Sequence, residues 1–263
     1  GFEVECKMAE AINPDHYKRG FHSSGTLGTF GAVVVAIKLL GLNRLQAAYA
    51  LGIAASFSSG IRANFGTMTK PLHVGRAAEN GIVAAELAAG GYTADPNGLD
   101  GPWGYFQVLG GGFDEEKIIG ALGNPYSIID PGVSVKPYPC GSLSHPSADA
   151  MLKLVVENDV KPEQVRKARV RAGSNILKPL RYGIARNELE AKFSLPFIMS
   201  SIILRRKAGI REFTDEFVQS EEARRMMEKV ETVHDPDIEA RGYDKMRSVV
   251  ELHLTDGRVL SEA

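Results

Sequence analysis

The chain is poor in cysteine: Cys6 and Cys140 are the only two thiols among 263 residues. Two thiols cannot form the disulfide framework of a small secreted protein, and they cannot supply the three cysteine ligands that an iron–sulfur hydratase would need. We therefore expect a reducing compartment, which is the cytoplasm, or mitochondria if a targeting segment lies upstream of this chain.

The sequence also lacks an excess of charge of one sign. It has 31 basic and 32 acidic residues, a net charge of -1 and no block of like charges. No apolar stretch of about 18 or more residues runs without a charged or polar break, so no transmembrane segment is predicted. Nucleic acid and membrane are therefore not expected as partners, and a small-molecule partner is favoured.

Metal and dinucleotide motifs are missing as well. The glycines at residues 25–28 do not match G-x-G-x-x-G and follow no predicted strand. The histidines show no close pairing at the spacing of metal ligands; they are His16, His22, His73, His145, His234 and His253. We expect neither a dinucleotide nor a bound metal.

Three apolar helices are predicted in the first half of the chain. Residues 29–40 are apolar nearly all round, which is typical of a helix buried between other helices, and Gly41 provides the stop. Asn43 and Gln46 have the spacing of a capping box, so a second helix should run to about residue 59.

A third helix should start near Pro71 and end at Gly90-Gly91. Small residues along it would allow close helix approach: Ala77, Ala78, Gly81, Ala84, Ala85 and Ala88. Together these helices predict a helical domain over residues 1–125.

The sequence pattern changes after Pro125. Residues 126–263 are predicted to form an α+β domain, with a Pro-Gly-rich hinge at about 123–141. Alternation of apolar and charged residues predicts a strand at VRKARVRAG and a terminal hairpin at RSVVELHLTDGRVL, with its turn at Asp256-Gly257. Helices are expected at SADAMLKLVVEN and at about 187–204 and 220–230.

Three bases gather in FGTMTKPLHVGRAA, at the start of the third helix: Lys70, His73 and Arg76. If Pro71 lies in the first turn, Lys70 and the free backbone N–H groups point together at the helix N-terminus, where the dipole favours an anion such as a carboxylate. The spacing fits a solvated lysine and an ordinary first-turn histidine equally well.

Two further histidines stand at predicted helix starts. His22, in RGFHSSGTLG, suits general acid or base work near neutral pH, although a structural, hydrogen-bonded histidine fits the pattern as well. His145, in KPYPCGSLSHPSADAM, precedes a helix that Ser144 or Ser147 could cap. Cys140 in the same segment lacks the motif of a catalytic nucleophile.

Four blocks together resemble the MmgE/PrpD family: GFHSSGTLGTFGA, FGTMTKPLHVGRAAENGIVAAELAAGG, KPYPCGSLSH and EAKFSLPF. The family includes 2-methylcitrate dehydratases, cis-aconitate decarboxylases and an iminodisuccinate epimerase, which act on small polycarboxylates without metal or organic cofactor. The resemblance implies a mainly α protein, with a large all-helical domain, a smaller α/β lid domain and an active site in the cleft between them.

The resemblance also assigns residues. His22, Lys70 and His145 match the family's catalytic positions, with the two histidines as acid and base across the cleft. Lys70, His73 and Lys136 are expected to bind substrate carboxylates. No cofactor is implied.

Two departures from the family pattern stand out. Family members are longer at both ends, so we expect a homodimer, or a complementary chain that supplies the missing segments. Phe197, in EAKFSLPF, stands where resembling enzymes carry tyrosine, and a phenyl ring cannot donate a proton.

The reaction implied first is dehydration of 2-methylcitrate or a related alkylcitrate by a cofactor-independent lyase. Decarboxylation of the cis-aconitate type and epimerisation of a polycarboxylate are the alternatives. A hypothesis of another class is a catalytically inactive, shortened paralogue that acts as a binding or assembly partner.

Overall fold

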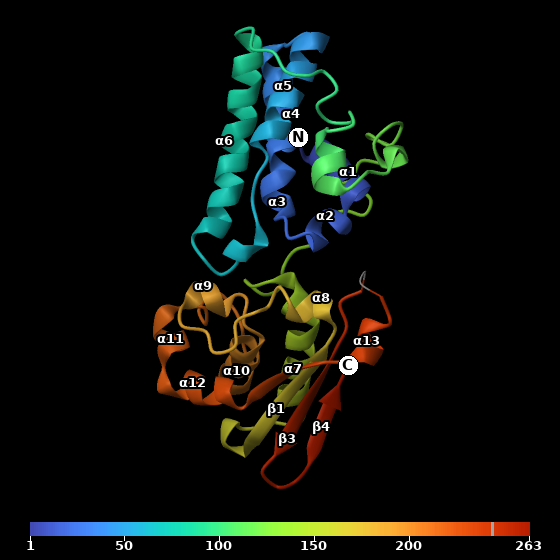
Figure 1. The fold of residues 1–263 in the computed structure, drawn as a ribbon. Coiled ribbons are helices and arrows are strands. Elements are labelled where there is room, and N and C mark those ends of the chain that lie inside the picture. Colours follow the sequence, from blue (N-terminus) through green and yellow to red (C-terminus); the bar gives the residue numbers. More distant parts are fainter. Residues whose placement is uncertain (243–244) are drawn as a thin grey trace. The chain divides into compact units, whose positions relative to one another are not determined.

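A computed structural model describes residues 1–242 and 245–263 and divides the chain into two compact units (Figure 1). The helical unit comprises Gly1–Asn64 and Met68–Ser134, and the α/β unit comprises Phe65–Thr67 and Val135–Ala263. The predicted fold class, a helical domain joined to an α/β domain, is confirmed.

The helical unit is built on α4, α5 and α6, which lie side by side (Figure 1). Its elements are α1 (Phe2–Ile12), α2 (Asp15–Lys18), α3 (Ser23–Thr26), α4 (Gly28–Leu40), α5 (Arg44–Phe57), η1 (Arg62–Asn64), α6 (Thr69–Ala89), η2 (Phe106–Gly110) and η3 (Glu115–Lys117).

The boundaries of α4 and α5 follow from local chemistry. Gly41 ends α4 in the left-handed conformation, at φ 64°. The Asn43 side chain accepts hydrogen bonds from the backbone of Leu45 and Gln46, and the Gln46 side chain accepts one from the backbone of Asn43. The predicted capping box is therefore present, and it begins α5.

Close contact between α4 and α6 depends on Gly81. A Cβ atom added there would lie 2.5 Å from the Ala32 Cβ atom and 2.7 Å from the Thr29 carbonyl oxygen. The predicted row of small residues does face the core, except for Ala78, which is exposed. As predicted, α4 packs between other helices, α1, α5 and α6, although part of its surface stays exposed, with Leu39 at 80%.

Ser23–Leu40, which spans α3 and α4, is long and apolar enough to cross a membrane by length and composition alone. Phe30 and Val33 within it are fully buried in the core of the helical unit. Their burial is what a core helix shows.

The sequence reasoning did not assign α1, which closes the helical unit. The Glu3 carboxylate on α1 accepts hydrogen bonds from the backbone N–H groups of Gly123 (2.8 Å) and Ser127 (2.7 Å). These bonds hold the pKa of Glu3 below its usual range. The irregular segment before residue 134 is therefore tied to the first helix.

The α/β unit contains a four-stranded sheet in the order β2-β1-β3-β4, with β1 and β2 parallel and the other pairs antiparallel. Its elements are η4 (Ser142–Ser144), α7 (His145–Glu157), η5 (Pro162–Gln164), β1 (Val165–Ala172), α8 (Ser174–Leu177), α9 (Glu188–Ala191), α10 (Leu195–Arg205), α11 (Asp215–Gln219), α12 (Glu221–Glu228), β2 (Val230–His234), α13 (Pro236–Glu239), β3 (Ser248–Leu254) and β4 (Val259–Glu262).

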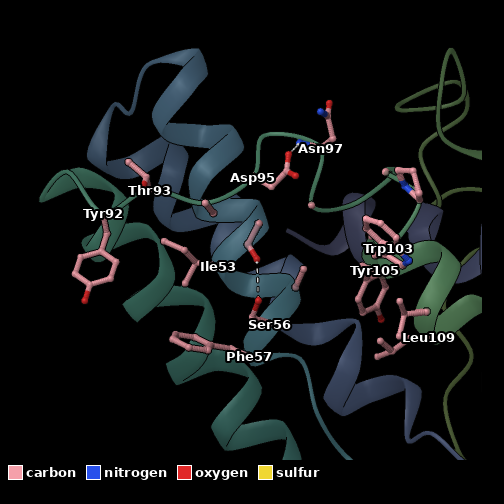
Figure 2. A pocket seen from close by; sticks show the side chains of 18 of the residues that line it. Ile53, Ser56, Phe57, Tyr92, Thr93, Asp95, Asn97, Trp103, Tyr105 and Leu109 are labelled. Atoms are coloured by element: carbon pink, nitrogen blue, oxygen red, sulfur yellow. Dashed lines mark hydrogen bonds between the residues drawn. The ribbon is translucent and has the colours of Figure 1, made fainter.

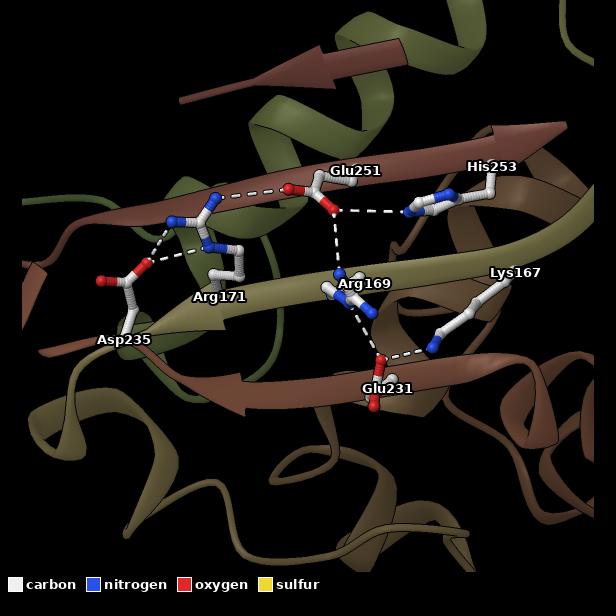
Figure 3. A network of polar contacts seen from close by, with 7 residues as sticks. All are labelled: Lys167, Arg169, Arg171, Glu231, Asp235, Glu251 and His253. Carbon is white, nitrogen blue, oxygen red and sulfur yellow. Dashed lines mark hydrogen bonds and ion pairs between the residues drawn. The ribbon is translucent and has the colours of Figure 1, made fainter. Parts of the chain in front are cut away.

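Helices α7 and α10 pack against the sheet, and its side chains alternate accordingly. On the other face a network of ion pairs joins β2, β1 and β3 (Figure 3). Arg169 pairs with Glu231, and Arg171 bridges Asp235 and Glu251. These arginines lie on the face away from the helices, and salt bridges account for them without any catalytic chemistry.

Two predictions about the α/β unit were wrong in detail. The helix expected over 187–204 is interrupted, because the Ser194 side chain caps a new helix, α10, whose second residue is Pro196. The helix expected to reach residue 230 ends at Glu228, and β2 follows at once, a strand that the sequence reasoning missed. The terminal hairpin is confirmed.

Two glycines on α6 provide a matched test of this packing. Gly81→Ala should lower the free energy of unfolding by about 1–3 kcal/mol, because the added methyl group has no room. Gly75→Ala should raise it by about 0.5–1 kcal/mol, because nothing lies within 4 Å of the added Cβ atom. Urea denaturation of both variants measures the difference, and equal stabilities would contradict this account of the α4–α6 contact.

Candidate functional site

His22 is held at the start of α3 by the loop that follows α5. It is the N-cap residue of that helix, and its side chain is almost fully buried. Its backbone N–H group donates a 3.0 Å hydrogen bond to the Gly60 carbonyl group, and the neighbouring Phe21 and Ile61 form an isolated β-bridge. The imidazole is therefore fixed from two segments of the chain.

The first turns of α6 bring a second histidine to the same place. Because α6 begins at Thr69, Lys70 is its second residue and His73 its fifth. The Nδ1 atoms of His22 and His73 are 3.0 Å apart, a hydrogen-bonding distance, and their ring centroids are 5.2 Å apart. Two histidines that are 51 residues apart in the sequence thus form one pair.

Two glycines make room for the His73 side chain. A Cβ atom on Gly25 would lie 3.0 Å from the Cβ atom of His73 and 3.0 Å from the Ser59 carbonyl oxygen. A Cβ atom on Gly60, at φ 137°, would lie 3.3 Å from the His73 ring. The absence of side chains at these positions lets the backbone close around the histidine pair.

Burial and a neighbouring cation keep the pair uncharged at neutral pH. Burial first, and then the nearby charges of Lys70 and His73, together lower the pKa of His22 to about 4. The pKa of His73 is also lowered, first by burial and then by Lys70. Lys70 therefore lies close enough to act on both imidazoles, and an anion held at Lys70 would act on them in the opposite sense.

Arg76 does not join this group. Its guanidinium forms an ion pair with Glu79 at 2.5 Å and donates a hydrogen bond to Asn80, one turn further along α6. Of the three bases in the FGTMTKPLHVGRAA segment, the structure brings Lys70 and His73 together with His22 and leaves Arg76 on the helix surface.

The α/β unit carries the other predicted residues as a second group. His145 is the first residue of α7, and Ser144 precedes it as N-cap without a side-chain capping bond. The ring of Tyr138 meets the His145 ring edge-on, with centroids 5.3 Å apart. Lys136 donates a 3.2 Å hydrogen bond to the Cys140 carbonyl group.

The His145 Nε2 atom is buried and has no hydrogen-bond partner among residues 1–242 and 245–263. Burial lowers the pKa of His145, and the Lys136 ammonium group lowers it further. A buried nitrogen without a partner is unfavourable unless a ligand or water completes it. This atom therefore supports a ligand-facing role for His145.

Tyr138 and Asp149 connect the two segments that carry Lys136 and His145. The Tyr138 hydroxyl group donates a 2.6 Å hydrogen bond to Asp149 on α7, and burial raises the pKa of Tyr138. The bond holds the segment that carries Lys136 against the helix that carries His145. Their spacing of 11 residues gave no recognisable motif. Burial raises the pKa of the Cys140 thiol, which does not favour a nucleophile there.

Phe197 lies in the core of the α/β unit. Its side chain is fully buried on α10, with ring centroids 5.2 Å from Phe213 and 5.8 Å from Phe217 in edge-on contacts. The ring contributes apolar packing at this position and no acid–base chemistry.

A metal site and an apolar pocket are weaker candidates within the described residues. Across the described parts of the chain, no three His, Cys, Asp or Glu side chains gather in a group that could hold a metal ion. A pocket of about 680 Å³ in the helical unit is lined by Ile53, Tyr92, Trp103 and Tyr105, among others (Figure 2). Its described lining includes the acid Asp95 and no Lys, Arg or His, so it does not suit a polycarboxylate.

The low pKa of His22 predicts how stability depends on pH. A folded-state pKa of about 4, against 6.5 unfolded, means that the unfolded chain binds more protons between these values. The contribution of neutral His22 to the free energy of unfolding is therefore complete above pH 6.5 and is lost as pH falls toward 4. The loss amounts to up to about 3 kcal/mol for this one group.

Urea unfolding from pH 4 to 7 should show a flatter profile for His22→Gln than for the native chain, because one of the contributing histidines is removed. A native-like slope in the His22 variant would contradict the assigned pKa.

Comparison with known proteins adds to this geometry. Residues 1–117 match the MmgE/PrpD N-terminal domain, and residues 138–263 match the MmgE/PrpD C-terminal domain. A cis-aconitate decarboxylase from Homo sapiens is 27% identical over 268 residues, which cover 100% of this chain and 55% of that protein.

Relatives from other organisms carry the same description. The cis-aconitate decarboxylase of Mus musculus is 27% identical over 100% of this chain and 54% of its own length. That of Aspergillus terreus (strain NIH 2624 / FGSC A1156) is 32% identical over 59% of this chain and 33% of its own length. The chain spans about half the length of the two mammalian relatives.

Proposed function

Since the chain belongs to the MmgE/PrpD family, we propose that it is a lyase acting on a small polycarboxylate. The observation that carries this proposal is the grouping of His22, His73 and Lys70 at the starts of α3 and α6. It combines one cation with two neutral imidazoles, which are the groups that binding a carboxylate and moving a proton require.

Decarboxylation of cis-aconitate or a close analogue is the reaction we favour. The relatives that align with this whole chain are named cis-aconitate decarboxylases, which supports decarboxylation over the dehydration of 2-methylcitrate that the sequence reasoning put first. The residues described above suit either reaction, so the choice between them rests on the relatives.

Lys70 is proposed to hold a substrate carboxylate at the start of α6, where the helix dipole also favours an anion. Loss of carbon dioxide breaks a carbon–carbon bond and leaves an electron pair on the substrate, which needs a nearby cation and then a proton. A polyanionic substrate would raise the pKa of His22 and His73, because opposite charge favours the protonated form. Substrate binding would then favour protonation of this histidine pair, which supplies the proton that the reaction consumes.

His145 and Lys136 are proposed to act on the same class of substrate. The Nε2 atom of His145 is buried without a partner within the described residues, and Lys136 supplies a cation beside it. Such a pair can bind a carboxylate and donate or accept a proton. His73 is proposed as a weaker substrate-binding residue than Lys70, because its Nδ1 atom already hydrogen-bonds His22.

Product analysis tests the reaction. Purified protein is incubated separately with cis-aconitate, 2-methylcitrate and citrate, and the products are resolved by mass. We expect loss of carbon dioxide from cis-aconitate. Loss of water from 2-methylcitrate alone would replace decarboxylase by dehydratase, and isomer interconversion would indicate an epimerase. Binding without turnover of any of the three would favour a partner protein that is not an enzyme.

Lys70→Met tests the carboxylate contact. Removal of the ammonium group should lower kcat/KM. The loss should correspond to about 2 to 4 kcal/mol of transition-state stabilisation, because a charge-assisted bond to the substrate is lost. Lys38→Met, which changes an exposed lysine on α4, is the matched control and should keep native kinetics. Native kinetics in a folded Lys70 variant would remove Lys70 from the site.

A further inference from the structure

The contact between His22 and His73 restricts where their protons can be. A hydrogen bond between two ring nitrogens needs one N–H donor and one lone pair, and the two Nδ1 atoms are 3.0 Å apart. Both rings cannot carry a proton on Nδ1 while this bond exists. The two imidazoles therefore have to differ in their protonation.

The difference extends to the outer nitrogens, because a neutral imidazole carries a single N–H group. The ring that donates from Nδ1 has a lone pair on Nε2, and the ring that accepts at Nδ1 has its proton on Nε2. The pair thus always offers one basic Nε2 atom and one Nε2–H donor. Moving the shared proton exchanges these two roles between His22 and His73.

Packing makes this bond a fixed feature of the helical unit. Gly25 and Gly60 close on the His73 side chain at distances that leave no space for another atom, and the backbone of His22 is bonded to Gly60. The beginning of α6 is held in turn by the close contact at Gly81 further along the same helix. A side chain at Gly25 or Gly60 would crowd His73 and disturb its contact with His22.

Protonation of the pair also has a defined limit. One added proton leaves the bond intact, since the charged ring donates from Nδ1 and the neutral ring accepts. A second added proton breaks it, because two Nδ1–H groups would then face each other beside the charge of Lys70. The two histidines consequently titrate as one coupled unit.

We propose that His73 is a positioning residue that acts through His22: its Nδ1 atom holds the two imidazoles in opposite tautomers, so that the tautomer of His22 is always complementary to that of His73. Only the kinetic consequence of this proposal rests on the lyase function proposed above. The tautomers themselves can be measured without any substrate.

The tautomers are read from ring-nitrogen chemical shifts of the full chain, labelled with ¹⁵N in histidine, at pH 7.5. We expect one ring of the pair to be protonated on Nδ1 and the other on Nε2. In His73→Phe, which keeps a ring of similar shape and removes the nitrogen, the His22 ring-nitrogen signals should shift, because the His22 Nδ1 atom loses its histidine partner. Unchanged His22 signals in that variant would overturn the proposal.

Kinetics separate positioning from simple packing. His73→Phe should lower kcat about tenfold or more while KM changes little. His73→Asn should recover most of this loss. Its amide oxygen and nitrogen are two bonds from Cβ, as Nδ1 is in histidine, and can hydrogen-bond His22. If the asparagine variant were as slow as the phenylalanine variant, or if both kept native kcat, the positioning role would be rejected.

Two controls complete the test. His234→Asn changes an exposed histidine of the α/β unit and should leave both the His22 signals and the kinetics unchanged. Gly25→Ala, which crowds His73, should disturb the His22 signals, whereas Gly28→Ala, where the nearest atom is 3.6 Å away, should not. If the native chain turned over no polycarboxylate, the lyase proposal would fail while the tautomer measurement still decided the pairing.

Discussion

The close approach of α4 and α6 sets the positions of the groups that matter in the helical unit. Gly81 allows the backbone of α6 to lie directly on α4, and the direction of α6 then determines where Lys70 and His73 emerge at its start. α4 follows α3 after a single residue, Leu27, so the same contact determines where His22 lies relative to them. A hydrogen bond between side chains 51 residues apart therefore depends on two helices that cannot slide past each other.

This arrangement combines one permanent cation with two imidazoles that resist becoming charged. Burial disfavours the charged forms of His22 and His73, and Lys70 adds repulsion. Without an anion the group carries little more than the charge of the lysine. A bound carboxylate changes the balance for all three groups at once, since it stabilises the ammonium group and both imidazolium forms. The electrostatic state of the site is thus coupled to its occupancy, which is useful when a proton is needed only after the substrate has arrived.

Local chemistry explains which features could be predicted from the sequence. Capping by Asn43, the left-handed Gly41 and the alternation in β1 are determined by residues within a few positions of each other, and all three were predicted. The exposed face of α4, the burial of Phe197 and the strand β2 depend on which elements pack together, and local patterns do not contain that information. For the same reason the candidate residues were found individually by motif and resemblance, but the pairing of His22 with His73 was not. Only the packed helices reveal it.

The carboxylate of Glu3 has a consequence for the order in which the helical unit forms. Its hydrogen-bond donors, Gly123 and Ser127, lie 120 and 124 residues further along the chain. Within this unit α1 is synthesised before the backbone groups of Gly123 and Ser127 that bond to it. Closure of so long a loop has a substantial entropic cost, and a contact of this kind forms late in folding, after α4, α5 and α6 have assembled. The two Glu3 hydrogen bonds thus join the two ends of the helical unit, in addition to the local packing of α1 on α4.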